Sequence, residues 1–176
     1  MIVAVMICWG IFVLVWVVGI AGNKQAVRME SLADRALHIF GTFLAFSLLF
    51  RDPPAPQPFG GWLGLVLTAT GAAVAIWARF TLGRNWSASV TVKANHELVR
   101  RGPYRMVRHP IYAGTLLAVL GTGLAFGHAQ GLLAFLVLLF TWKRKSLTEE
   151  KFMMEQFGEQ YVQYKREVKA LIPFLL

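Results

Sequence analysis

The sequence predicts an all-α integral membrane protein with about five transmembrane helices, of which the last two form a tight hairpin followed by a cytoplasmic C-terminal helix. Composition is the first observation, because 56% of the 176 residues are hydrophobic and only 15% are charged, whereas soluble domains average about 25% charged residues. The second is that the apolar residues form separate runs. The third is that nearly all cations fall in alternate connecting segments. We expect a single domain over residues 1–176, with helical spans in 1–81 and the polar motifs in 82–176.

Five apolar runs predict the helices. A spanning helix needs roughly 17–25 apolar residues, which the runs 2–20 and 62–80 supply. The run 37–50 is shorter, and residues 32–35 could extend it as an interfacial turn; the prolines that follow predict a loop. Two further short runs, 111–126 and 132–142, predict the hairpin, with a re-entrant hairpin as the alternative. The one cysteine, Cys8, lies within the first run, which leaves no disulfide framework.

The distribution of positive charge predicts the orientation. Except for Arg51, all 18 Lys and Arg residues fall in the loop 22–36, in the connection 79–108 or in the tail 143–169. Positive charge marks the cytoplasmic side, so we expect the N-terminus outside and these three segments inside. In the tail, an apolar stripe of helical spacing predicts a helix over 146–168, and Gly158 marks a possible kink or break.

A basic, turn-rich block at residues 96–114 is the strongest candidate for a site. Pro110 restricts His109 to an extended backbone and suits the first turn of a following helix. The free N–H groups of that helix, together with Arg108 and His109, favour an anion, and Tyr112 adds a ring and a hydroxyl. The alternative is an interfacial anchor. No metal site is expected, because His96 and His109 lack Cys or Asp partners at ligand spacing.

Paired glutamates, Glu149 and Glu150, follow the last apolar run beside a cationic cluster. One interpretation is a capping box in which Ser146 starts a helix and Glu149 closes it at N3. The other is that a carboxylate at this position holds the ammonium or ribose hydroxyls of a cofactor. The sequence leaves both open.

The segment from Leu82 to Phe174 resembles the isoprenylcysteine carboxyl methyltransferase family and its phospholipid methyltransferase relatives. The matching motifs are His96-Glu97-Leu98-Val99, Gly102-Pro103-Tyr104, Arg108-His109-Pro110-Ile111-Tyr112-Ala113-Gly114, Glu149-Glu150, and Phe157-Gly158-Glu159-Gln160-Tyr161 with Tyr164 and Pro173. The resemblance implies a membrane enzyme that binds S-adenosyl-L-methionine. The candidate cofactor-binding residues are those that the resemblance implies and their neighbours in the same motifs: His96, Leu98, Val99, Tyr104, Arg108, His109, Pro110, Tyr112, Glu149 and Glu150.

The same resemblance implies direct methyl transfer, with Lys145 and Glu149 as catalytic candidates. Lys145 replaces an arginine of the family that faces the substrate, so the charge is kept and the planar fork is lost. The implied partners are membrane lipids and a lipophilic acceptor that enters from the bilayer, for which a carboxylate is one candidate; no nucleic acid is implied. The implied location is the cytoplasmic membrane, with the cofactor site facing the cytoplasm.

Two other functions remain open from the sequence. An NADPH-dependent membrane reductase of the sterol-reductase type would use Arg100 and Arg101 for the additional phosphate of its cofactor. A non-catalytic lipid-binding membrane protein would explain the basic face, although not the paired tyrosines or the His-Pro turn.

Overall fold

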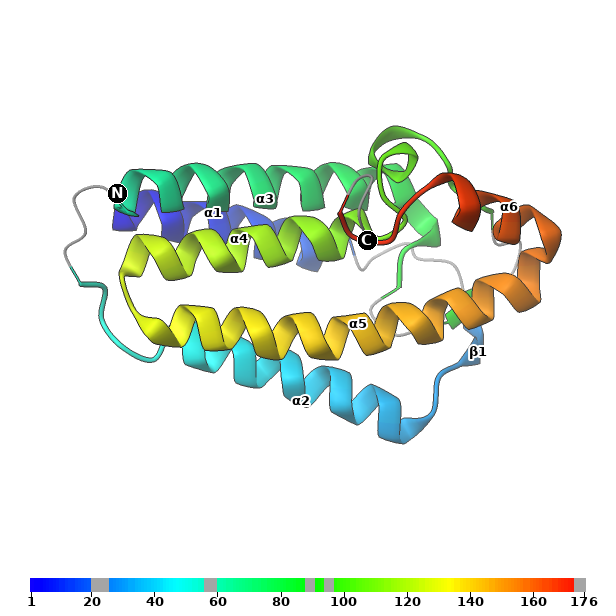
Figure 1. The fold of residues 1–176 in the computed structure, drawn as a ribbon, viewed down its shortest axis with the longest axis horizontal. Helices are drawn as coiled ribbons and strands as arrows, with labels where there is room; N and C mark the ends of the chain where they lie inside the picture. Colours follow the sequence, from blue (N-terminus) through cyan, green and yellow to red (C-terminus); the bar gives the residue numbers. More distant parts are fainter. Residues whose placement is uncertain (20–25, 56–59, 88–90, 94–96, 173–176) are drawn as a thin grey trace.

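Helices dominate the computed structural model, which describes residues 1–19, 26–55, 60–87, 91–93 and 97–172. The main helices run alternately up and down as a bundle (Figure 1). They are α1 (Ile2–Val18), α2 (Leu32–Leu49), α3 (Gly60–Leu82), α4 (Pro110–Phe126) and α5 (Ala129–Phe157), and a short α6 (Glu159–Glu167) follows. The described parts of the α1–α2 connection and of the α3–α4 connection lie with α6 at one end of the bundle, which we call the basic end.

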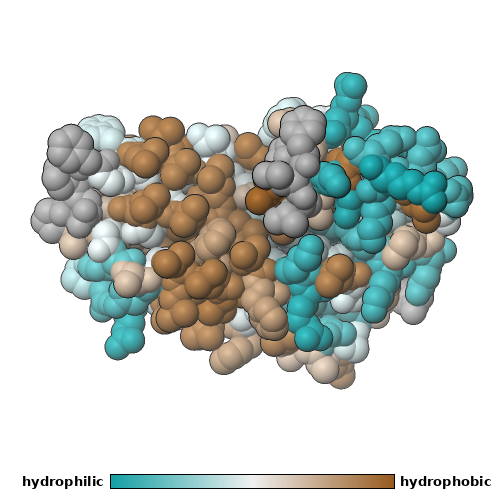
Figure 2. All heavy atoms as spheres, viewed as in Figure 1, coloured by the Kyte–Doolittle hydropathy of each residue, from teal (hydrophilic) through white to brown (hydrophobic). Residues whose placement is uncertain are grey.

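The surface of the bundle is divided in the way that a membrane protein requires. Hydrophobic side chains form a broad band across the helices, and hydrophilic side chains gather over α6 and the adjoining part of α5 (Figure 2). Helices α2 and α3 are long and apolar enough to cross a membrane, and α1 and α4 are apolar but shorter. The predicted helical architecture is thus confirmed, whereas the number of spans stays a prediction.

Two helices are longer than the sequence analysis predicted. Helix α2 is continuous from Leu32 because the hydroxyl of Ser31 caps it, accepting a hydrogen bond of 3.1 Å from the Asp34 amide. The predicted extension of the run 37–50 by residues 32–35 is confirmed, but these residues form the first turn of the α-helix and not an interfacial turn. Helix α3 continues to Leu82, so Arg79 belongs to a helix and not to the loop. Its buried guanidinium donates to the Gly19 carbonyl at the end of α1 and lies 4.4 Å from the ring centroid of Trp86.

The tail also differs from its predicted form. Helix α5 continues without interruption past the last apolar run, so residues 146–157 extend it and do not start a new helix. Ser146 donates a 2.8 Å hydrogen bond to the Lys143 carbonyl within α5. The capping-box interpretation of Glu149 is therefore wrong. The predicted break at Gly158 is confirmed, since this residue has φ +53° and separates α5 from α6.

A two-stranded antiparallel ribbon at the basic end was not predicted. It pairs β1 (Ala26–Met29) with β2 (Thr91–Lys93). A second backbone pairing brings the tail to the start of α4, because Arg108 N–H donates to the Lys169 carbonyl at 2.8 Å and His109 N–H to the Ala170 carbonyl at 3.0 Å. The first pairing joins the α1–α2 connection to the α3–α4 connection, and the second joins the α3–α4 connection to the tail, all at the basic end.

Close packing of α3 on α4 fixes the position from which the polar block begins. A Cβ on Gly71 would lie 2.4 Å from the Gly114 carbonyl oxygen, and one on Gly121 would lie 2.5 Å from the Thr68 amide nitrogen. Any larger side chain would force the helices apart, which is the role that small residues have in membrane helix packing. The N-terminus of α4, which carries His109 and Tyr112, is therefore held rigidly at the basic end.

Candidate active site

A cavity of about 660 Å³ opens toward the basic end of the bundle. Aromatic and aliphatic side chains of α1, α2 and α5 form its apolar wall: Phe12, Trp16, Ile39, Phe43, Phe46 and Trp142. Ionisable and hydroxyl-bearing side chains also line it, among them His38, Tyr104, Arg108, His109, Tyr112, Lys145 and Glu149. A cavity with a polar part and an apolar part suits a ligand that combines charge with a hydrocarbon body.

Most of the residues predicted from the sequence come together here. The predicted residues that line the cavity are Leu98, Val99, Tyr104, Arg108, His109, Tyr112, Lys145 and Glu149. Pro110 and Glu150 are buried but do not line it. His96 lies outside the described residues. The assigned roles of all these residues stay predictions.

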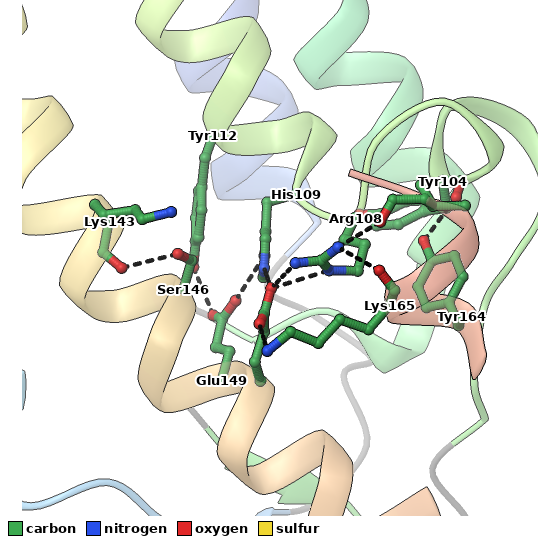
Figure 3. Close-up of polar contacts among 11 residues, drawn as sticks. Tyr104, Arg108, His109, Tyr112, Lys143, Ser146, Glu149, Tyr164 and Lys165 are labelled. Carbon is green, nitrogen blue, oxygen red and sulfur yellow. Dashed lines mark hydrogen bonds and ion pairs between the residues drawn. The ribbon is translucent and has the colours of Figure 1, made fainter. Parts of the chain in front are cut away.

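Glu149 of α5 contacts two side chains at the start of α4, those of His109 and Tyr112. The Tyr112 hydroxyl donates to Glu149 Oε1 at 2.5 Å, and His109 Nδ1 lies 3.4 Å from Glu149 Oε2 (Figure 3). The rings of His109 and Tyr112 stack with their centroids 5.5 Å apart, as their spacing across the first turn of α4 allows. Lys145, one turn before Glu149, has its Nζ 5.7 Å from the Tyr112 ring centroid, within the range of a cation–π contact.

Glu150 lies behind this group, in an ion-pair network with the tail. Its Oε1 accepts from Arg108 Nε at 2.9 Å and Nη2 at 2.5 Å, and its Oε2 lies 2.8 Å from Lys165 Nζ. Arg108 also donates to the Val168 carbonyl. His109 Nε2 lies 3.3 Å from Glu150 Oε1. His109 therefore bridges a glutamate that faces the cavity and a glutamate that holds α6.

The two glutamates and His109 shift one another's protonation. Burial alone would lower the pKa of His109, but its contacts with Glu149 and Glu150 outweigh burial and raise it. Burial alone would raise the pKa of Glu149, but the contact with His109 and the charge of Lys145 hold it below its usual range. The pKa of Glu150 is lowered for the same kind of reason, by His109, Lys165 and Arg108 against burial. Both glutamates are thus ionised at neutral pH.

The raised pKa of His109 predicts that the protein loses stability as pH rises. A group whose pKa is higher in the folded state stabilises that state fully below its unfolded pKa, and this contribution disappears as pH rises through the folded pKa. Between about pH 6 and about pH 9 we expect the melting temperature of the wild type to fall more than that of His109→Gln. Parallel melting curves for the two proteins over this interval would contradict the assignment.

Another ionisable pair, Glu30 and His38, places one member in the cavity wall, from a part of the chain in which the sequence analysis predicted no site residue. His38 lines the cavity, and its Nδ1 lies 2.9 Å from Oε2 of Glu30, with the two side chains 6% and 1% exposed. Glu30, in the predicted loop 22–36, and His38, in the apolar run 37–50, lie eight residues apart, and this spacing matches no motif. Their one signal was the presence of two ionisable residues next to an apolar run.

The reductase alternative finds no support in the positions of its arginines. Neither Arg100 nor Arg101 lines the cavity. Arg100 pairs with Glu167, and its guanidinium carbon lies 5.1 Å from the ring centroid of Tyr164. The guanidinium of Arg100 therefore lies against the tail and not in the cavity.

Comparisons with known proteins agree on one group of relatives. The sequence profile of the phospholipid methyltransferase family matches residues 59–160. A probable protein-S-isoprenylcysteine O-methyltransferase of Oryza sativa subsp. indica is 30% identical over 120 residues, which cover 66% of this chain and 63% of the relative. The cobalt-zinc-cadmium resistance protein CzcN of Cupriavidus metallidurans is 34% identical over 137 residues, which cover 76% of this chain and 60% of the relative.

A solved structure is similar in fold as well. The structure of a eukaryotic intramembrane Ras methyltransferase, an isoprenylcysteine carboxyl methyltransferase, has a TM-score of 0.57 and 25% sequence identity to this chain. The similarity covers 85% of this chain and 55% of that protein. The chain thus spans less than two thirds of the length of these relatives, at 63%, 60% and 55%.

Proposed function

This chain belongs to the phospholipid methyltransferase family, and we propose that it is a membrane enzyme that transfers a methyl group from S-adenosylmethionine to a lipophilic acceptor. The observation that carries the proposal is the two-part cavity, in which the Glu149, His109 and Tyr112 cluster adjoins a wall of aromatic side chains. Relatives named as isoprenylcysteine O-methyltransferases support the same activity.

The described residues fit this cofactor. S-adenosylmethionine carries a positive sulfonium and an ammonium group, and the cavity offers an ionised carboxylate, Glu149, whose side chain keeps 24% exposure. The rings of Tyr104 and Tyr112 line the same space, and aromatic faces attract cations. Leu98 and Val99 add an apolar surface suited to a purine ring.

When bound, the cofactor supplies a methyl group that is already activated as a sulfonium. The task of this chain is therefore to orient the two reactants and to exclude water, and good orientation alone can contribute roughly 7–11 kcal/mol. Glu149, His109 and Tyr112 would hold the polar part, with Tyr112 keeping the carboxylate in one rotamer. The apolar wall of Phe43 and Phe46 would receive the hydrocarbon part of the acceptor.

Calorimetry on the purified protein tests the proposal most directly. We expect heat of binding with S-adenosylhomocysteine, the neutral product of methyl transfer, and none with NADPH. Binding of NADPH without binding of S-adenosylhomocysteine would favour the reductase. The absence of binding to both would leave a lipid-binding protein as the better interpretation.

We further propose five spans with the N-terminus outside and the cavity facing the cytoplasm. The support is that α1 to α5 alternate in direction and that all Lys and Arg residues but Arg51 belong to the three segments expected inside. In a Cys8→Ser background, cysteines at the exposed positions 35 and 166 should react with a membrane-impermeant reagent from the same side, and a cysteine at position 51 from the other. Labelling of 35 and 166 from opposite sides would contradict this orientation.

A further inference from the structure

Glu30 and His38 form a buried ionisable pair next to the cavity that none of the family motifs includes. Nδ1 of His38 lies 2.9 Å from Oε2 of Glu30, and Nδ1 makes no aligned hydrogen bond with any described residue. By this distance, Nδ1 is the ring nitrogen that lies beside the carboxylate. Because His38 also lines the cavity, Nε2, at the other edge of the ring, is the atom left for a ligand.

The packing of α2 on α5 sets the position of this pair along the bundle. Trp142 Nε1 donates to Thr42 Oγ1 at 3.0 Å, and the two helices run in opposite directions (Figure 1). One turn from Thr42 toward the basic end leads to His38, and about one turn from Trp142 in the same direction leads to Lys145. His38 and Lys145 are therefore at about the same depth in the bundle.

Among the described residues, the charged groups that act on His38 include Glu30 and Asp34 from its own segment and Lys145 from α5. Glu149, one turn beyond Lys145, lines the same cavity. His38 thus belongs to the wall of the candidate active site, and Glu30 contacts His38 without lining the cavity.

We propose that His38, oriented by Glu30, is the general base for the methyl acceptor, and that the accepting group is an amine or a thiol that carries a proton. This inference rests on the proposed methyltransferase function. A carboxylate next to Nδ1 favours the tautomer with hydrogen on Nδ1, which leaves the lone pair on Nε2. An acceptor that is already an ionised carboxylate needs no base, and Lys145 lacks the planar fork that grips a carboxylate at two points.

The proposed step combines a methyl transfer with a proton transfer. A lone pair of the acceptor forms the bond to the methyl carbon while the bond between that carbon and the sulfonium sulfur breaks, and its electron pair returns to sulfur as a neutral thioether. The proton of the acceptor passes to Nε2 of His38. Water takes this proton after the product leaves, which restores the neutral imidazole.

The test uses the full chain in detergent and three probes that share one hydrocarbon tail. They are farnesylamine, farnesyl thiol and N-acetyl-S-farnesylcysteine, which ends in a carboxylate, and transfer is followed with a radiolabelled methyl group. The variants are His38→Gln and Glu30→Gln. The matched control is His128→Gln, which changes a histidine in the connection between α4 and α5, at the other end of the bundle.

We expect the wild type to methylate the amine or the thiol. His38→Gln should lower that rate about 100-fold or more, since a positioned base contributes roughly 10²–10⁴-fold. Glu30→Gln should lower kcat about 10-fold at unchanged KM for the acceptor, and Glu30→Asp should recover part of it. All variants should bind S-adenosylhomocysteine with an affinity within about 3-fold of wild type, and His128→Gln should retain the full rate.

Several results would overturn the inference. One is a rate in His38→Gln that stays within about 3-fold of wild type; another is transfer to the carboxylate probe alone. A wild type that binds S-adenosylhomocysteine and methylates neither protic probe also contradicts it, while the proposed function survives. A joint loss of melting temperature and of S-adenosylhomocysteine binding in His38→Gln assigns the pair a structural role, and a wild type that does not bind S-adenosylhomocysteine ends both proposals.

Discussion

Replacing Glu149 with glutamine is expected to weaken the binding of S-adenosylhomocysteine roughly 10- to 150-fold, which corresponds to the loss of one charge-assisted hydrogen bond at about 1.5–3 kcal/mol. The Glu149 carboxylate faces the cavity, is ionised at neutral pH, and is held by the Tyr112 hydroxyl at 2.5 Å. Glutamine keeps an oxygen that can accept from Tyr112, so the local geometry is retained while the charge is removed. Isothermal titration calorimetry gives the affinity directly.

The matched control for this experiment is Glu155→Gln. Glu155 lies on the same helix, is exposed and does not line the cavity, so its removal changes the net charge equally without touching the candidate site. We expect near wild-type affinity in this control and a small change in melting temperature in both variants. Wild-type affinity in Glu149→Gln would mean that this carboxylate does not contact the cofactor.

The general architecture could be predicted from the sequence because membrane helices depend on local composition. Apolar length and the positions of Lys and Arg are properties of short segments, and they gave the five main helices and their alternation. Helix ends were less accurate for a physical reason. Arg79 and residues 143–157 are charged or polar, yet tertiary contacts keep them helical: Arg79 caps α1 at Gly19, and α5 continues because α6 and the start of α4 pack on it.

The sequence could predict only those residues of the candidate site that lie close to one another along the chain. His109 and Tyr112 lie in one helical turn and adjoin Pro110, so their spacing already indicated a shared surface. His38, with Glu30 beside it, reaches the same cavity through the packing of α2 against α5, which includes a hydrogen bond between Trp142 and Thr42. Pairings between residues 100 apart leave no trace in a single sequence, which is why this wall of the cavity was missed.

Replacing Glu150 with leucine is expected to have the largest effect on stability, a loss of about 3–5 kcal/mol in the free energy of unfolding, because it leaves a buried guanidinium without its counter-ion. The side chains of Arg108 and Glu150 are only 7% and 4% exposed. Arg108 joins Glu150 to the Val168 carbonyl, so the contacts between α5, α6 and the start of α4 should loosen together. Denaturant titration in detergent micelles measures the loss, and limited proteolysis should show earlier cleavage within the tail.

A second ion pair of the same tail gives the control. Arg100 and Glu167 are 39% and 45% exposed, and exposed pairs contribute only about 0–1 kcal/mol, so Glu167→Leu should be close to neutral. The double variant Arg108→Met with Glu150→Leu should recover part of the stability, because a buried apolar pair removes the uncompensated charge. If Glu150→Leu proves no more destabilising than Glu167→Leu, Glu150 does not hold α6 against the bundle, and its low pKa has no structural consequence.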